Sequence, residues 1–254
     1  MAAGSVAHVE RGVQLASLWG TDHEALGEIA VEEVGPRLAA ALSRGRFPKG
    51  YPHLDLNEDG ALAARSGGAA VLAVADGHNG FDAARAALEE VRQQVPALLA
   101  SVPASPEAAL RRCLAAATEA VTQAGSGLEE KRAGTGTALT VAVVGPARLT
   151  VGGFGDCVAL VLRGARAKQV GGAAPFIGPG MHPGLGATAR ADLRPGDRVL
   201  VATDGVVEFL GRGWKRRLAG LARGLAPAEL ARAAIEAAFK GGAGDNIAVV
   251  VLEG

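Results

Sequence analysis

The sequence has little of what marks secreted, membrane-bound or disulfide-rich proteins. Its 254 residues include only two cysteines, which is too few for a disulfide framework. Apolar stretches are short and broken by glycine or charge, and none approaches the roughly 20 residues that span a bilayer. The first eleven residues lack the charged start and apolar centre of a secretory signal. We therefore expect a cytoplasmic protein with no membrane partner.

No charge of one sign prevails either. Lys and Arg together number 26, Asp and Glu also number 26, and no basic run stands out, so nucleic acid is not an expected partner. Aromatic residues make up only 4% of the chain, so Ala, Val and Leu must build the core. With 49% hydrophobic residues the chain can form one large domain, and no repeat or linker divides residues 1–254.

Hydrophobic periodicity predicts strands and helices in separate blocks. Apolar or alternating runs predict strands at residues 13–19, 69–75, 137–144, 149–154, 158–162, 197–203 and 247–252. Helical spacing and end signals predict helices at residues 22–42, 80–94, 105–124, 206–210 and 227–240, with Pro96 ending the second. The strands between 137 and 162 are expected to form an antiparallel meander, and the Gly- and Pro-rich segment 163–194 a loop region. This order favours an α+β fold with antiparallel sheets.

Five aspartates next to glycine, most at the ends of apolar runs, are candidate metal ligands: Asp59, Asp76, Asp156, Asp204 and Asp245. Each of these dipeptides alone is more simply explained as a turn. If the carboxylates converge, they repel each other strongly unless cations hold them together. Oxygen donors with little histidine or sulfur suit Mg²⁺ or Mn²⁺ rather than zinc. Spacing alone does not decide between turns and a metal cluster.

Six short motifs, in chain order, resemble those of the protein phosphatase 2C (PPM) family of metal-dependent Ser/Thr phosphatases. They lie at residues 57–59 (Asn-Glu-Asp), 74–80 (Val-Ala-Asp-Gly-His-Asn-Gly), 134–138 (Gly-Thr-Gly-Thr-Ala), 155–157 (Gly-Asp-Cys), 203–206 (Thr-Asp-Gly-Val) and 244–246 (Gly-Asp-Asn). Each motif is weak alone, but six in family order are a strong signal. The resemblance implies a four-layer α-β-β-α sandwich of two antiparallel sheets flanked by helices. Residues 1–43 have no obvious counterpart in the family and are expected, from their periodicity, to add an extra N-terminal strand and helix.

The same resemblance implies a ligand set for two or three Mn²⁺ or Mg²⁺ ions. Asp76, Asp204 and Asp245 correspond to the ligands of one ion. Asp76, the Gly77 carbonyl oxygen and Asp59, directly or through water, correspond to the ligands of a second. Two such ions can activate a water for in-line attack on phosphorus.

Further positions carry over with differences from the family. Asp156 resembles the ligand of a third, weaker ion, and His78 lies where the family has a proposed general acid for the leaving alkoxide. The family commonly has a phosphate-binding arginine five residues before its first motif's aspartate, and this chain has Leu54 there. Arg46 and Lys49 are nearby cations that could replace it. The flap region at 163–194 is shortened, which leaves substrate selection open.

The leading expectation is a phosphomonoester hydrolase that dephosphorylates phosphoserine or phosphothreonine on proteins. One alternative is a noncatalytic interaction module that keeps the fold, because Leu54 replaces the arginine. Another is a phosphatase of small phosphorylated metabolites, which an open site with a short flap would admit. The aspartates, if they converge, argue against a pure scaffold, since a scaffold has no need of clustered negative charge.

Overall fold

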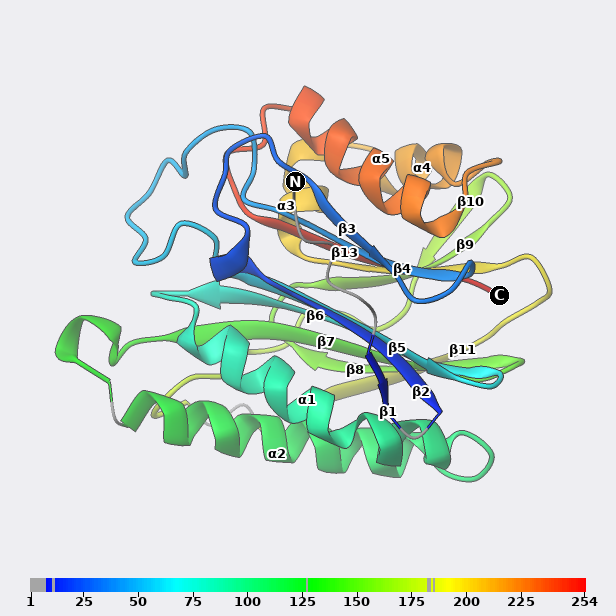
Figure 1. Ribbon diagram of the computed structural model, residues 1–254, viewed down its shortest axis with the longest axis horizontal. Helices are drawn as coiled ribbons and strands as arrows, with labels where there is room; N and C mark the ends of the chain where they lie inside the picture. The colour runs from blue at the N-terminus through cyan, green and yellow to red at the C-terminus, as the bar shows by residue number, and fades with distance from the viewer. Residues whose placement is uncertain (1–7, 11, 127, 182–183, 185) are drawn as a thin grey trace.

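The computed structural model describes residues 8–10, 12–126, 128–181, 184 and 186–254. Its strands form two antiparallel sheets that pack face to face (Figure 1). The first sheet has the order β1 (His8–Glu10), β2 (Val13–Trp19), β5 (Asp59–Ser66), β6 (Ala69–His78), β7 (Gly136–Val144), β8 (Arg148–Phe154) and β11 (Ala187–Asp192). The second has the order β10 (Arg166–Gln169), β9 (Val158–Arg163), β12 (Arg198–Ala202), β13 (Ile247–Glu253), β4 (Leu38–Ser43) and β3 (Ala30–Glu33).

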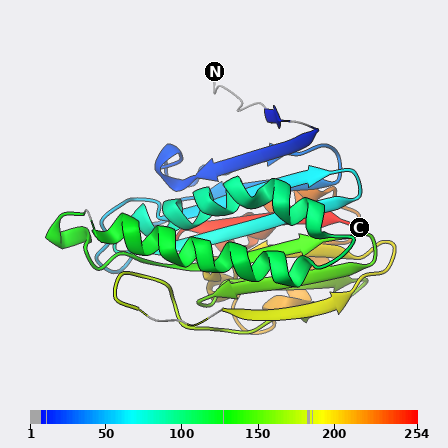
Figure 2. The ribbon, with the colours of Figure 1, turned by 90° about the horizontal axis from the view of Figure 1, so that it is seen from below.

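Helices cover the outer face of each sheet. Helices α1 (Asp82–Ser101) and α2 (Pro106–Ser126) lie side by side across the first sheet, as Figure 2 shows. Helices α3 (Asp204–Leu210), α4 (Trp214–Leu221) and α5 (Pro227–Lys240) cover the second. Short 3₁₀ turns occur at Gly20–Asp22 and Glu130–Arg132. The expected α+β fold, a four-layer α-β-β-α sandwich, is confirmed.

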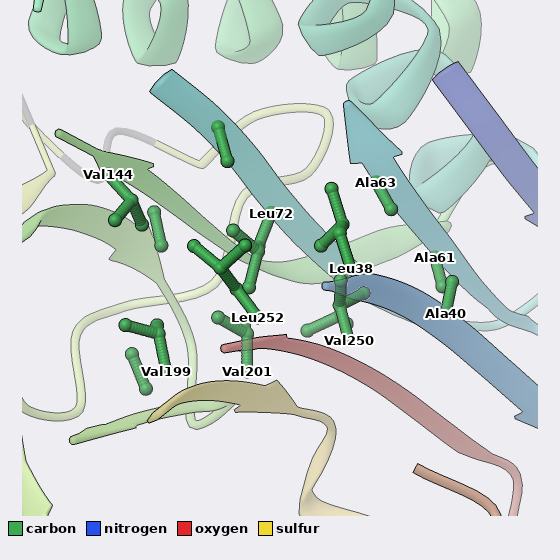
Figure 3. Close-up of a cluster of buried hydrophobic side chains, with 14 of the residues drawn as sticks. Leu38, Ala40, Ala61, Ala63, Leu72, Val144, Val199, Val201, Val250 and Leu252 are labelled. Carbon is green, nitrogen blue, oxygen red and sulfur yellow. The ribbon is translucent and has the colours of Figure 1, made fainter. Parts of the chain in front are cut away.

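The space between the sheets is filled by small and medium aliphatic side chains. Ala61, Ala63 and Leu72 of the first sheet face Val201 and Val250 of the second, and all five are fully buried (Figure 3). Burying a Val or Leu side chain contributes about 1.5–3 kcal/mol. A core of such residues therefore stabilises the sandwich without the aromatic residues that the sequence lacks.

Most predicted strands are confirmed within a residue or two, but the meander is only half right. β7 and β8 pair as a hairpin, whereas β9 pairs with β10 and β12 in the other sheet. The turn at Gly155 and Asp156 therefore crosses from one sheet to the other. This crossing brings Asp156, which stays exposed, to the end of the sandwich where Asp76 and Asp204 lie.

The helix predicted at 22–42 is wrong. This segment forms β3 and β4, which pair with each other, and β4 also pairs with β13 inside the second sheet. Gly27 and Gly35 have positive φ angles, which end regular structure at both points. β4 is buried on both faces, so its continuous apolar run has no alternation to distinguish it from a buried helix. Residues 1–43 thus contribute strands to both sheets rather than a strand and a helix.

Two further expectations are corrected. Helix α1 does not end before Pro96 but continues to Ser101, because Val95, Leu98 and Leu99 keep its apolar face packed on the sheet. This packing offsets the roughly 3 kcal/mol that an interior proline costs. The segment 163–194 is not simply a loop, since it includes the edge strands β10 and β11; its residues 182–183 and 185 lie outside the described residues. Helix α4 and strand β5 were not expected.

None of the helices within the described residues combines the length and apolarity needed to cross a membrane.

Candidate metal centre

Two aspartates extend the inner face of the first sheet beyond its apolar core. Ala61 and Val74 are paired across β5 and β6, and both are buried between the sheets. Because side chains alternate between the two faces of a strand, the pair two residues further on faces the same way. That pair is Asp59 and Asp76. Like charges directly opposite each other are destabilising, so two facing carboxylates here need a compensating partner.

Two polar residues next to strands of the second sheet form hydrogen bonds with residues at the start of β5. Thr203 follows β12 and Asn246 precedes β13, in step with the inner apolar residues of those strands. The Thr203 hydroxyl donates to Asp59 Oδ2 at 2.8 Å. The Glu58 backbone N–H donates to Asn246 Oδ1 at 2.8 Å. The two sheets are therefore joined by hydrogen bonds at the end where the apolar core stops.

The closest carboxylates come from three different elements. Asp76 lies in β6, Asp156 in the turn between β8 and β9, and Asp204 at the first position of α3. Each offers one oxygen, and these three oxygens all lie within 4.8 Å of one another. The predicted convergence is thus observed for these three residues, which the chain separates by up to 128 positions.

The electrostatics of the cluster are those of crowded carboxylates, of which Asp59 and Asp76 are buried, Asp204 is half-buried and Asp156 is exposed. Burial raises the pKa of Asp76 well above its usual value, and the charges of Asp59, Asp204 and Asp245 raise it further. Burial also raises the pKa of Asp59, partly offset by the positive charge of Lys49. The pKa of Asp204 is raised to about 6, first by burial and then by neighbouring carboxylates. A divalent cation would relieve the mutual repulsion that adds to the effect of burial in these shifts.

The carboxylate of Asp245, at the other side of the cluster, already has partners within the protein. Lys49 Nζ lies 3.3 Å from Asp245 Oδ1 and 2.9 Å from Glu58 Oε2. The Tyr51 hydroxyl lies 3.0 Å from Asp245 Oδ2. The other Glu58 oxygen accepts from the Gly80 backbone N–H at 2.7 Å. This side therefore has its own counter-charge from the protein.

Two glycines allow the close approach of backbones around the aspartates. A Cβ on Gly77 would lie 2.6 Å from the Glu58 carbonyl oxygen. A Cβ on Gly205 would collide with the Asn246 carbonyl oxygen. Glycine is therefore required at both positions by contact with neighbouring backbone. The Gly77 carbonyl as a ligand stays a prediction.

His78 stands at the mouth of the cluster. Its side chain is 43% exposed, and its Nδ1 lies 3.8 Å from Asp76 Oδ1. Its ring packs on Phe176 with the centroids 4.8 Å apart. It can thus face both the carboxylates and a ligand arriving from solvent, as a proton donor for a leaving group must.

The nearby cations differ from the expectation. Leu54, at the position of the family's arginine, is exposed, and so is Arg46. Arg132 reaches the rim of the site but binds both oxygens of Asp55 at 2.8 Å and Asp82 at 2.7 Å. The Arg132 guanidinium is therefore already paired with two carboxylates. The sequence analysis had not suggested this arginine as a neighbour of the site. Lys49 is the cation that faces the aspartates.

Sequence reasoning missed three members of the site. Glu58 stands in the Asn-Glu-Asp motif, but only its neighbour Asp59 was taken as a ligand. Its contacts with Lys49 and Gly80 show that it belongs to the cluster. Tyr51 and Thr203 had weaker signals: Tyr51 lies in an irregular segment, and Thr203 is an ordinary neighbour of Asp204.

The residues present fit hard divalent cations. The donors that converge are carboxylate oxygens, with neither cysteine nor histidine among the three closest. This donor set suits Mg²⁺ or Mn²⁺. The raised pKa values of Asp59 and Asp76 agree: burial is their largest cause and neighbouring carboxylates add to it, and a bound cation would favour the ionised form of both groups.

The fold and this acidic end together define the class of the PPM-type phosphatases. The structure is similar to the Mycobacterium tuberculosis serine/threonine phosphatase PstP, with 25% identity, a TM-score of 0.66, and coverage of 85% of this chain and 97% of that chain. It is similar in fold to a PstP catalytic domain solved with two manganese ions, at 23% identity and TM-score 0.68, covering 89% of this chain and 99% of that chain. The Mycobacterium smegmatis phosphatase MsPP, solved with cacodylate, matches at 21% identity and TM-score 0.61, covering 90% and 98%.

The family follows from the sequence itself. Residues 66–253 match the family model described as Stage II sporulation protein E (SpoIIE). The chain belongs to this family. No curated protein sequence matches the chain significantly.

Proposed function

We propose that the protein is a Mn²⁺- or Mg²⁺-dependent phosphomonoester hydrolase that acts on phosphoserine or phosphothreonine in proteins. The convergence of Asp76, Asp156 and Asp204 within 4.8 Å is the observation that carries the proposal. Bound divalent cations would supply an activated water and would neutralise charge on the transferring phosphoryl group. The family and the manganese-containing relative of the same fold support this reading.

The residues of the chain have distinct roles in this proposal. Asp59, Asp76, Asp156, Asp204 and Asp245 hold the cations, together with the carbonyl oxygen of Gly77. His78 donates a proton to the leaving alkoxide from its partly exposed position beside Asp76. Thr203 and Asn246 keep the carboxylates of the two sheets aligned through their hydrogen bonds.

An apolar rim supports a polypeptide substrate over a small metabolite. Four of the large exposed hydrophobic residues lie in the loop that carries Lys49: Phe47, Tyr51, Leu54 and Leu56, with exposed fractions of 38–51%. Apolar residues gathered beside a site mark a contact surface more often than scattered ones do. A peptide flanking the phosphorylated residue would cover them, whereas a small phosphate ester would not.

The first experiment tests the chemistry. Hydrolysis of an aryl phosphate should require Mn²⁺ or Mg²⁺ and should fall by at least about 100-fold in Asp76→Asn and Asp204→Asn. Even the loss of a residue that only hydrogen-bonds to a metal ligand typically lowers metal affinity or activity about 10–100-fold. Asp192→Asn, an exposed aspartate at the far end of β11, is the control and should keep full activity. Unchanged activity in Asp76→Asn would refute the proposed metal site.

The second experiment tests the substrate class. Leu54→Ser and Leu56→Ser should lower kcat/KM for phosphopeptides while leaving the aryl phosphate rate unchanged, and Leu26→Ser, also exposed, should change neither. Equal or better turnover of small phosphorylated metabolites would favour the metabolite phosphatase. Mn²⁺ binding without hydrolysis of any phosphate ester would favour the noncatalytic module, which the exposed Leu54 motivates.

A further inference from the structure

The loop of residues 44–58, between β4 and β5, turns a lysine into the acidic cluster. The Lys49 side chain is only 3% exposed although its neighbours on the loop are exposed. A lysine on a surface loop can usually carry its ammonium group to water along its flexible stem. Here the stem is directed inward, so the position of the ammonium group calls for a specific reason.

The contacts of the ammonium group explain its position. Lys49 Nζ lies 2.9 Å from Glu58 Oε2 and 3.3 Å from Asp245 Oδ1, and 5.4 Å from the centre of the Tyr51 ring. Burying an ammonium group is costly unless it is paired and hydrogen-bonded. Burial lowers the pKa of Lys49, but the charges of Asp245, Asp59 and Glu58 raise it by more. The lysine is therefore charged where it lies.

Tyr51 completes the occupation of Asp245. Its hydroxyl lies 3.1 Å from Asp245 Oδ1 and 3.0 Å from Oδ2, and the Asn246 backbone N–H donates to Oδ1 at 2.8 Å. Both Asp245 oxygens thus have hydrogen-bond partners within the protein. A divalent cation that binds this carboxylate therefore competes for its oxygens with these hydrogen bonds and with the Lys49 ammonium group.

The opposite side of the cluster is different. Among the described residues, no lysine or arginine forms an ion pair with Asp76, Asp156 or Asp204. The charge of Lys49 lowers the pKa of Asp76 by less than the neighbouring carboxylates raise it, so repulsion prevails on this side. The cluster is therefore divided into a side with its own cation and a side without one.

We propose that Lys49 is a built-in cation of the Glu58–Asp245 side of the cluster that competes with a divalent cation for these carboxylates. The Asp76–Asp156–Asp204 side then binds metal first, without Asp245, which the resemblance to the family would group with Asp76 and Asp204. The inference rests on the metal site proposed above. No covalent bond forms or breaks in the exchange: the ammonium group gives up its ion pairs with Glu58 and Asp245 and moves out to water, and these carboxylates would then bind the divalent cation. Only the lysine side chain has to turn outward, and its chain neighbours Pro48 and Gly50 are already exposed, so the movement needs no rearrangement of the core.

Calorimetric titration of the metal-free protein with MnCl₂ tests the order of binding. The wild type should bind one equivalent tightly and a second at least ten times more weakly. Lys49→Met removes the competing charge and should strengthen the second step at least tenfold, leaving the first within about threefold. Lys49→Arg keeps the charge and should resemble the wild type. Lys240→Met, an exposed lysine at the end of α5, is the matched control and should also resemble the wild type.

Chemical labelling of wild-type lysines tests the displacement without any variant, in case Lys49→Met does not fold. In metal-free protein an amine-reactive reagent should modify Lys49 at least tenfold more slowly than Lys240, as read by peptide mass spectrometry. A second equivalent of Mn²⁺ should remove most of this protection. Mg²⁺ should act in the same way at higher concentration.

The outcomes separate this inference from the proposed function. Two Mn²⁺ equivalents of unchanged affinity in Lys49→Met, or continued protection of Lys49 at saturating Mn²⁺, would overturn the inference and leave the metal site standing. Failure of every variant to bind Mn²⁺ would overturn both. A second binding step strengthened in Lys49→Met but not in Lys49→Arg would support the role of the lysine charge.

Discussion

Asn246 joins three segments of the chain, and its replacement by alanine should be among the most damaging single changes outside the apolar core. The residue is 1% exposed. Its Nδ2 donates to the carbonyl oxygens of Arg44 at 3.0 Å and Leu56 at 3.1 Å, and its Oδ1 accepts from the Glu58 N–H at 2.8 Å. One side chain thus fixes both ends of the loop that carries Lys49.

The expected cost follows from these three bonds. Each contributes about 1 kcal/mol net, and a buried backbone group left without a partner costs about 1–3 kcal/mol. Asn246→Ala should therefore lower the free energy of unfolding by about 3–5 kcal/mol, a large share of the 5–15 kcal/mol typical of a native protein. Asn246→Asp keeps the acceptor but cannot donate to the two carbonyl oxygens, so we expect it to be at least as unstable.

Urea denaturation of metal-free protein, followed by circular dichroism, measures the effect. Asn57→Ala is the matched control, since Asn57 is also fully buried but makes one short bond, from Nδ2 to the His23 carbonyl oxygen at 2.9 Å, and one long one at 3.4 Å. It should cost about 1–2 kcal/mol. A loss below about 1 kcal/mol in Asn246→Ala, with an unchanged slope against urea, would refute the reasoning. Because Asn246 also aligns Glu58, its loss should weaken Mn²⁺ binding about 10–100-fold.

Three further predictions concern the glycine contact and the titration of the acids. Gly205→Ala should weaken Mn²⁺ binding at least about tenfold in calorimetry while preserving helix content, because the new Cβ meets the Asn246 carbonyl and displaces the adjacent Asp204. Hydrogen bonds from Arg163 lower the pKa of Asp197, so this stabilisation is present at pH 7 and is lost as the pH falls through the lowered folded-state pKa. Asp197→Asn should therefore cost about 1–3 kcal/mol in urea at pH 7 and little near pH 2, and an equal loss at both would contradict the prediction. The pKa of Asp204 is raised to about 6, so its effect on stability runs in the opposite direction with pH. Metal-free protein should gain thermal stability as the pH falls from about 7 to 4, and saturating Mn²⁺ should reduce that gain.

The site residues that can be predicted from the sequence are those that lie at the ends of apolar strands. Asp76 ends a continuous apolar run, and in an antiparallel sandwich such ends meet at the edges of the sheets. The order of the short motifs then related Asp76 to Asp156 and Asp204, which the structure brings together. Asp197 had the same local pattern, and it does form a turn, accepting from the Arg194 N–H at 2.8 Å. Local sequence alone could not separate these two cases.

What the sequence could not predict depends on contacts between distant segments. Lys49 and Tyr51 meet Asp245, about 195 positions further along the chain, through side chains on an irregular loop. No periodicity describes such a loop, so only the closed fold fixes where its side chains point. The strand β4 fails for a related reason: its apolar residues suit a helix or a buried strand equally, and pairing with β13 decides between them.

The acidic end of the sandwich trades stability for binding. Burial raises the pKa values of Asp59 and Asp76, and repulsion from neighbouring carboxylates raises them further. Both effects destabilise the folded chain when these groups are ionised, while Thr203 and Lys49 offset part of the cost. A cation that binds only the folded state restores stability by about 2.7 kcal/mol at one hundred times its dissociation constant. A protein that satisfied these carboxylates fully with its own lysines would gain nothing from metal. Because one side of the cluster has no lysine, a divalent cation that binds there can still stabilise the folded protein.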